Sequence, residues 1–217
     1  MKNYFSLQLL LLVVSGSLFA QGNLIVPDAS QKSGVSQRIG VTDISLTYNS
    51  PLVKGRTIWG EVVPFGEVWR AGANENTVIT FSTPVKISGK VLPAGSYGLH
   101  MIPGKNSWVV IFSNNFRSWG SYFYDPAEDA LRIEVTPEAA VMQEWLSYRF
   151  TDLKASSAQV LLNWEKIGVG FLVEVNLPET VVQSMRDELR GDKGFFGKPY
   201  GRPPIFVREI MFMVRML

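Results

Sequence analysis

The sequence of 217 residues contains no cysteine and a single histidine. The absence of cysteine excludes disulfide bridges, thiolate metal sites and attachment of a lipid to a cysteine. One imidazole cannot build a histidine zinc site by itself. The chain also lacks the Gly-x-Ser-x-Gly, His-Glu-x-x-His and phosphate-loop motifs. Stability must therefore come from an apolar core, for which thirteen Phe, seven Tyr and six Trp supply large side chains.

The chain also has neither a large excess of charge of one sign nor a long apolar run. The formal net charge is only +2, and the basic excess lies after residue 190. Nothing in the main part of the chain therefore indicates binding to nucleic acid or to anionic lipid. No segment approaches the roughly 18 uninterrupted apolar residues that a membrane helix needs, so we expect no membrane span.

The N-terminus has the layout of an export signal. Lys2 is followed by an apolar stretch over residues 7–14 and by small residues up to Ala20. This stretch is too short to cross a bilayer, and a small residue precedes the expected cut. We predict a signal peptide over residues 1–20, cleaved after Ala20, and a periplasmic or secreted mature protein. The alternative is a buried N-terminal strand or helix.

From residue 36 to residue 177 the chain consists of short segments of alternating polarity, separated by Gly, Pro, Asn and Asp. Alternation with a period of two is typical of half-buried strands. The segments with this pattern are 41–48, 77–81, 85–87, 95–102, 108–112, 130–135, 145–150, 157–164 and 169–176. We predict an all-β domain over residues 21–177, an antiparallel β-sandwich or jelly roll of about eight or nine strands.

A helix is predicted directly after the β domain, over residues 178–190. Val181, Val182, Met185 and Leu189 recur at helical spacing there, and Gly191 follows the last of them.

Several ordered motifs resemble a known family. They are SPLVKGRTIWG at 50–60, VPFGEVWRAGANENT at 63–77, LPAGSY at 92–97, IPG at 102–104 and NWE at 163–165. On these motifs the chain, over roughly residues 27–175, resembles the domain of unknown function 2911 family. That resemblance implies an exported Bacteroidetes-type protein with a β fold. It implies no activity, since the family has none established.

The first two motifs supply the candidate ligand-binding residues. Guanidinium groups beside indole rings recognise carboxylates or sugar hydroxyls, and Trp faces suit pyranose rings. The structural alternative is that the arginines pair with Glu61, Glu67 or Glu75 to fix a long loop, while the tryptophans fill the core. The candidate residues are Arg56, Trp59, Trp69, Arg70, Asn74 and Glu75.

Three other groups have structural explanations. We interpret His100 as a half-exposed strand residue. The acidic residues 125, 128 and 129 depart from calcium-loop spacing and indicate a solvated turn. The aromatic residues 119, 122, 123 and 124 fit either a glycan platform or packing between sheets. We therefore expect no metal ion and no cofactor, and we predict no catalytic residue.

The tail over residues 191–217 is anomalous. The run GKPYGRPP at 197–204 excludes a helix or a central strand. The resemblance implies an alanine-rich helical extension here instead. The codons for residues 196–207 can also be read in a frame that starts one base earlier. With suitable synonymous codons, this shifted frame encodes WEALWAAANFC, a sequence of high helix propensity. We hypothesise that the tail from residue 197 is out of frame; the alternative is a genuine basic, proline-rich tail.

Three function classes follow from these features. We favour a non-catalytic module that binds a carbohydrate or a peptide through the candidate residues. The second class is a structural or interaction domain of the cell envelope. The third is a hydrolase, which would need a carboxylate pair such as Glu67 and Glu75 across one cleft.

Overall fold

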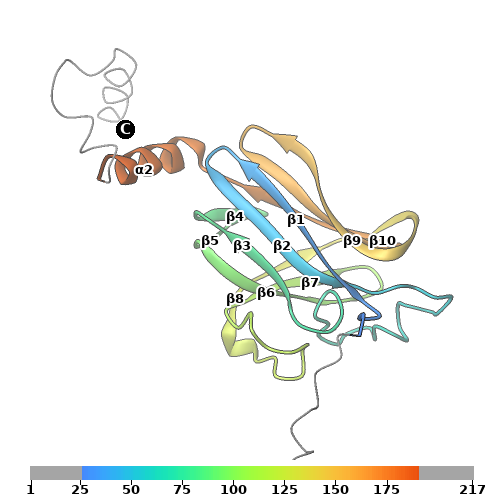
Figure 1. Cartoon of the computed structure of the whole chain (residues 1–217). Coiled ribbons are helices and arrows are strands. Elements are labelled where there is room, and N and C mark those ends of the chain that lie inside the picture. Colours follow the sequence, from blue (N-terminus) through green and yellow to red (C-terminus); the bar gives the residue numbers. More distant parts are fainter. Residues whose placement is uncertain (1–25, 191–217) are drawn as a thin grey trace, which may run out of the picture.

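The computed structural model describes residues 26–190 of the chain. The predicted signal peptide and the anomalous tail lie outside the described residues. The described residues form ten strands, a short 3-10 helix and an α-helix (Figure 1): β1 (Gln31–Ile39), β2 (Thr42–Ser50), β3 (Thr77–Phe81), β4 (Val85–Ile87), β5 (Lys90–Leu92), β6 (Gly95–Ile102), β7 (Trp108–Ser113), η2 (Pro126–Glu128), β8 (Asp129–Val135), β9 (Glu138–Lys154), β10 (Ser157–Glu174) and α2 (Leu177–Arg190).

Two antiparallel sheets face each other. One has the order β1-β2-β3-β6-β7-β8 and the other β5-β4-β10-β9. Aromatic pairs join them: the ring centroids of Phe112 and Phe171 are 5.4 Å apart, and those of Tyr48 and Tyr148 are 4.9 Å apart. The core between the sheets is stabilised by burial of these and other apolar side chains. The predicted antiparallel sandwich followed by a helix is confirmed.

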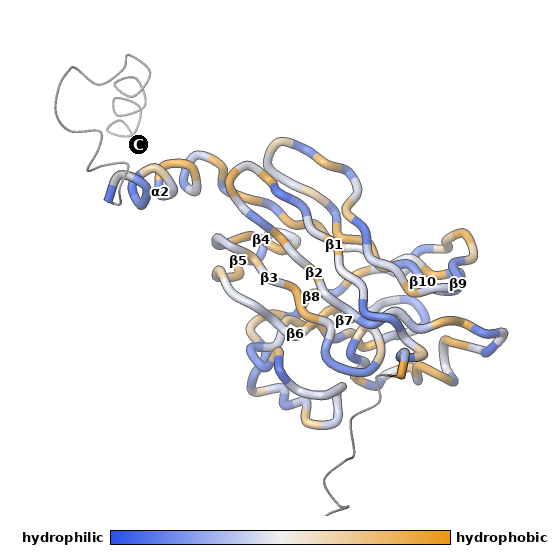
Figure 2. The backbone as a smooth tube through the Cα atoms, viewed as in Figure 1, coloured by the Kyte–Doolittle hydropathy of each residue, from blue (hydrophilic) through white to orange (hydrophobic). Residues whose placement is uncertain are grey.

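Strand β2 shows how the sequence places side chains in this core. Its residues alternate between buried and exposed, so Ile44, Leu46 and Tyr48 point inward. Successive side chains of a strand point to opposite faces, which gives this period of two. Figure 2 shows the resulting alternation of hydrophobic and hydrophilic segments along the strands.

Several strands differ from the sequence prediction. β9 spans Glu138–Lys154 where 145–150 was predicted. The sequence patterns did not predict β1, because its residues are mostly polar. As the outer strand of its sheet, β1 has only alternate side chains partly covered. β10 is one continuous strand where two were predicted, at 157–164 and 169–176. Irregular pairing around Glu165, whose φ is +55°, takes up the extra residues as a bulge.

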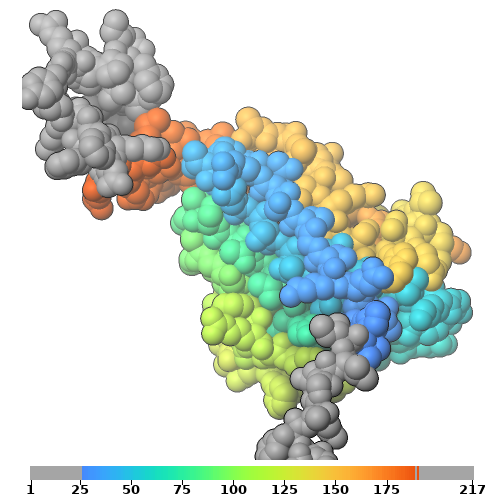
Figure 3. All heavy atoms as spheres, viewed as in Figure 1, coloured from blue at the N-terminus to red at the C-terminus, as the bar shows by residue number. Residues whose placement is uncertain are grey.

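Helix α2 projects from one end of the sandwich (Figures 1 and 3). Its first residue, Leu177, packs over Gly40 in the turn between β1 and β2. A Cβ atom on Gly40 would lie 2.0 Å from Leu177 Cδ2, and Gly40 has a φ of +59°. Glycine is therefore required there both for space and for backbone conformation. No helix in the described part of the chain is long and apolar enough to cross a membrane.

Candidate functional site

The long connection between β2 and β3, residues 51–76, carries all six candidate residues. It is fixed to the sandwich at the centre of the second motif. The backbone of Trp69 exchanges two hydrogen bonds of 2.8 Å with Met101 of β6. The buried Tyr148 hydroxyl of β9 donates to the Ala71 carbonyl at 2.7 Å. Strands from both sheets thus hold the segment that contains Arg70.

A second loop, residues 114–128 between β7 and β8, meets this connection at the end of the sandwich away from α2 (Figure 1). The backbone nitrogen of Asn76 donates to the Ser118 carbonyl at 3.4 Å. Gly120 lies directly against Arg70: a Cβ atom there would be 2.6 Å from a terminal guanidinium nitrogen. The close approach of the two loops encloses space between them.

A cavity of about 550 Å³ lies between these two loops. Three of the six candidate residues line it: Arg56, Trp69 and Arg70. The other three, Trp59, Asn74 and Glu75, do not. The remaining lining residues, most of them apolar, are Ser30, Pro51, Val62, Val63, Pro64, Glu67, Val68, Gly72, Ala73, Ser121, Tyr122 and Trp164.

Arg70 is the more buried of the two arginines that line the cavity. It is half-buried, and its guanidinium carbon lies 5.6 Å from the ring centroid of Trp119, a cation–π distance. Its Nε atom is buried and has no hydrogen-bond partner among the described residues. Because Nε has essentially no accessible surface, only the terminal guanidinium nitrogens of Arg70 are within reach of an acceptor in the cavity.

Arg56 and Glu67 are exposed residues of the same cavity. Arg56 donates from Nε to the Val53 carbonyl at 3.0 Å and from Nη2 to the Leu52 carbonyl. Within residues 26–190, neither Arg56 nor Arg70 forms a salt bridge, so the pairing with Glu61, Glu67 or Glu75 in the structural alternative is absent. The positive charge of both arginines is therefore not neutralised by a carboxylate in contact.

The tryptophans of the two motifs belong to a packed cluster. The centroid of Trp59 lies 4.8 Å from that of Trp108 and 5.7 Å from those of Trp69 and Trp164. Trp69 stacks on Trp164 at 5.9 Å and donates through Nε1 to the Gly72 carbonyl at 3.0 Å. Trp59 therefore packs in this cluster rather than on the cavity wall, whereas Trp69 does both.

Asn74 and Glu75 bond to neighbouring parts of the fold. The side-chain nitrogen of Asn74 donates weakly to the Ser30 carbonyl at 3.4 Å, and the φ of Asn74 is +55°. Asparagine tolerates this left-handed conformation better than most residues. Glu75 accepts a hydrogen bond of 2.8 Å from the buried Asn49 of β2. These contacts anchor the end of the connection.

His100 is buried, and the expectation of a half-exposed histidine was wrong. It is 2% exposed, because β6 lies inside the sheet and loop 114–128 covers it. Its Nδ1 atom is 2.9 Å from the hydroxyl of Ser121, which lines the cavity. Burial lowers the pKa of His100 to about 4, opposed in part by the charge of Asp129. A neutral His100 thus holds Ser121 in place at the cavity wall.

The acidic group after Tyr124 forms an internally bonded turn. Asp125 caps η2 by accepting from the Ala127 amide at 2.9 Å. Asp129 bonds to the Tyr124 hydroxyl and to Arg132. Burial and the hydrogen bond to Asp129 raise the pKa of Tyr124 to about 12. Residues 26–190 contain no group of three or more His, Cys, Asp or Glu placed to hold a metal ion.

The aromatic residues of loop 114–128 do not pack between the sheets. Trp119, Tyr122 and Phe123 are 54%, 74% and 75% exposed. The rings of Trp119 and Tyr122 are stacked, with centroids 5.7 Å apart and planes 8° apart. The sequence contains no signal for the position of these residues, because Trp119 meets Arg70 only through the fold.

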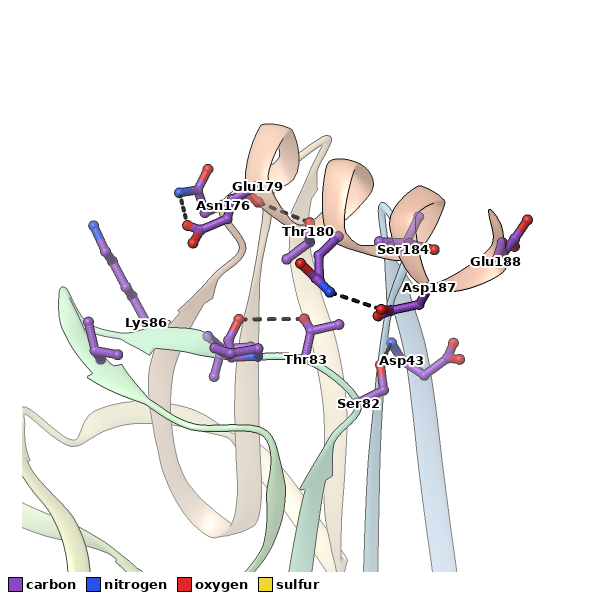
Figure 4. Close-up of a pocket in the computed structure, with 15 residues that line it drawn as sticks. Asp43, Ser82, Thr83, Lys86, Asn176, Glu179, Thr180, Ser184, Asp187 and Glu188 are labelled. Atoms are coloured by element: carbon purple, nitrogen blue, oxygen red, sulfur yellow. Dashed lines mark hydrogen bonds between the residues drawn. The ribbon is translucent and has the colours of Figure 1, made fainter. Parts of the chain in front are cut away.

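A second cavity, of about 650 Å³, lies between α2 and the sandwich (Figure 4). Its polar side chains largely bond to one another: Asn176 donates to Glu179 and Gln183 to Asp187, at 2.8 and 2.9 Å. Asp43 is engaged by Arg38 in an exposed ion pair. Unlike the arginine-lined cavity, this one has no arginine among its described lining residues; its lining cation is Lys86 of β4.

Comparison with models of known protein families identifies the family of the chain. The family described as "Protein of unknown function (DUF2911)" matches residues 30–173, more than half of the sequence. The chain belongs to this family. Searches of curated proteins and of solved structures gave no match. The matched region of this DUF2911 protein includes both loops of the arginine-lined cavity.

The cavity of the DUF2911 domain also bears on the hydrolase alternative. Glu67 is the one carboxylate among its described lining residues, and Glu75 is bonded to Asn49 instead. The pair of carboxylates that the hydrolase interpretation required does not line this cavity.

Proposed function

We propose that this DUF2911 protein is an exported, non-catalytic binding module whose cavity takes a carboxylate-bearing carbohydrate or peptide. The N-terminal sequence pattern supports export. The observation that carries the binding proposal is that two arginines, Arg56 and Arg70, line one cavity and neither forms a salt bridge within residues 26–190.

The chemistry of the lining suits an acid. A carboxylate accepts two hydrogen bonds from a guanidinium in a planar arrangement, and such charge-assisted bonds are stronger than neutral ones. Arg56 and Arg70 both lack a carboxylate partner within the described chain. Glu67 and Ser121 add groups that can bond to ligand hydroxyl or amide groups. Trp69 contributes an apolar wall.

A second function, an interaction domain of the envelope, is favoured by one observation. Helix α2 projects from the sandwich and offers a surface outside the cavity (Figure 3). In that case the arginines would only support the loops. Ligand binding separates the two proposals.

The test is isothermal titration of the purified protein with galacturonate and with N-acetylglutamate, using galactose and N-acetylglutamine as neutral counterparts. We expect the acids to bind with dissociation constants of about millimolar, because one charge-assisted contact dominates. Replacing Arg70 by Ala (Arg70→Ala) should weaken acid binding by about tenfold or more.

The control is Arg149→Ala, which removes an exposed arginine of β9 that does not line the cavity. It should leave acid binding unchanged. Equal binding of acids and neutral counterparts, or an Arg149 effect as large as that of Arg70, would contradict the proposal.

A further inference from the structure

An exposed aromatic surface borders the arginine-lined cavity. We define the aromatic shelf as Trp119 and Tyr122, whose rings are stacked nearly parallel on loop 114–128. Tyr122 is 74% exposed and also lines the cavity, so its ring belongs to both features. A side chain of this size left in solvent beside a cavity is available for contact with a ligand.

The shelf is joined electrostatically to the cavity. The guanidinium of Arg70 lies over Trp119, and Gly120 allows the backbone to approach this guanidinium closely. Any carboxylate bound by Arg70 would therefore have the shelf as its neighbour. The positions of the charge and of the aromatic surface are thus fixed relative to each other by short contacts.

We propose that the aromatic shelf is a subsite for a pyranose ring, so that the ligand of the cavity is an acidic carbohydrate containing uronic acid residues. This inference rests on the proposed binding of a carboxylate at Arg70. The ring C–H groups of a pyranose carry partial positive charge and pack on the negative face of an aromatic ring. Pyranose hydroxyl groups would donate to the Glu67 carboxylate and bond to the Ser121 hydroxyl.

A peptide fits the same features less well. An acidic side chain would satisfy Arg70, but a flexible peptide would lose more conformational entropy when it is ordered against the exposed face of the Tyr122 ring. A sugar ring is already rigid and flat-sided. The combination of an exposed planar surface with an adjacent unpaired cation therefore favours the carbohydrate over the peptide.

The experiment compares two ligands of similar charge, tetragalacturonate and tetraglutamate, by titration calorimetry on the purified full chain. Only tetragalacturonate contains pyranose rings. We expect it to bind about fivefold to tenfold more tightly than tetraglutamate, the magnitude of one aromatic stacking contact. Tyr122→Ala should remove this preference by weakening tetragalacturonate binding, and urea denaturation of the variant reports that it is folded.

The matched control is Phe123→Ala. Phe123 is as exposed as Tyr122 and lies in the same loop, but it neither stacks on Trp119 nor lines the cavity. This variant should retain the preference. If the two tetramers bind equally, or if Tyr122→Ala keeps the preference, the carbohydrate inference is overturned while carboxylate binding stands. If neither tetramer binds, carboxylate binding itself is refuted.

Discussion

His100 is neutral in the folded protein at pH 7 because it is buried in β6 beside Ser121. Its pKa is lowered to about 4, whereas a histidine in an unfolded chain titrates near 6.5. Between these two values the unfolded chain binds a proton that the folded chain does not. The free energy of unfolding should therefore decrease as the pH falls from about 6.5 to 4, by about 3 kcal/mol in total from this residue.

This pH dependence is measured by urea denaturation at pH 7.5 and 4.5. The wild type should lose more stability between the two values than His100→Gln, which keeps a polar side chain near Ser121 but does not titrate. Equal losses in the two proteins would show that His100 is not the responsible group.

Individual residues of the site were predictable only in part. Arg56, Trp69 and Arg70 were recognised from their types and spacing, and they line the cavity. Trp59 was indistinguishable from Trp69 in sequence, because a motif does not show which indole faces inward. Tyr122 was placed by the fold alone, since it lies far from Arg70 along the chain.

At the scale of elements, loop 114–128 determines where the Arg70 guanidinium sits. Gly120 has a φ of +67°, and a Cβ atom there would meet Arg70 at 2.6 Å and Tyr122 at 3.3 Å. Gly120→Ala should displace the guanidinium and weaken galacturonate binding by about tenfold. It should also lower the free energy of unfolding by about 1 kcal/mol through backbone strain. Calorimetric titration and urea denaturation measure the two effects.

Gly89→Ala provides the matched control for this loop. Gly89 has a similar φ of +83° in the hairpin between β4 and β5, with no atom within 4 Å of the added Cβ. It should show the same strain without the loss of binding. A comparable loss in both variants would mean that Gly120 acts on global stability rather than on Arg70.

The elements themselves were more predictable than the site. Strands with one buried face, such as β2, show the alternating pattern that their environment imposes. β1 lacked this signal because an outer strand buries few side chains. The division of β10 into two predicted strands came from polar residues at a bulge, which interrupts the pattern without ending the strand.

At the scale of the whole molecule, the fold brings together segments that are far apart in sequence. Loop 114–128 folds back over β6, where Ser121 bonds to His100, and so meets connection 51–76 beside one cavity. Helix α2 borders a second cavity at the other end of the sandwich (Figures 1 and 4). The two cavities are therefore separate candidates for the position of a ligand.

The central claim is that the arginine-lined cavity, rather than the one beside α2, binds a carboxylate. A crystal structure of the protein soaked with galacturonate tests it most directly. We predict density for the sugar in the cavity of Arg56 and Arg70, with its carboxylate within hydrogen-bond distance of the Arg70 guanidinium. Density for the sugar in the cavity beside α2, with the arginine-lined cavity holding only solvent, would contradict the claim.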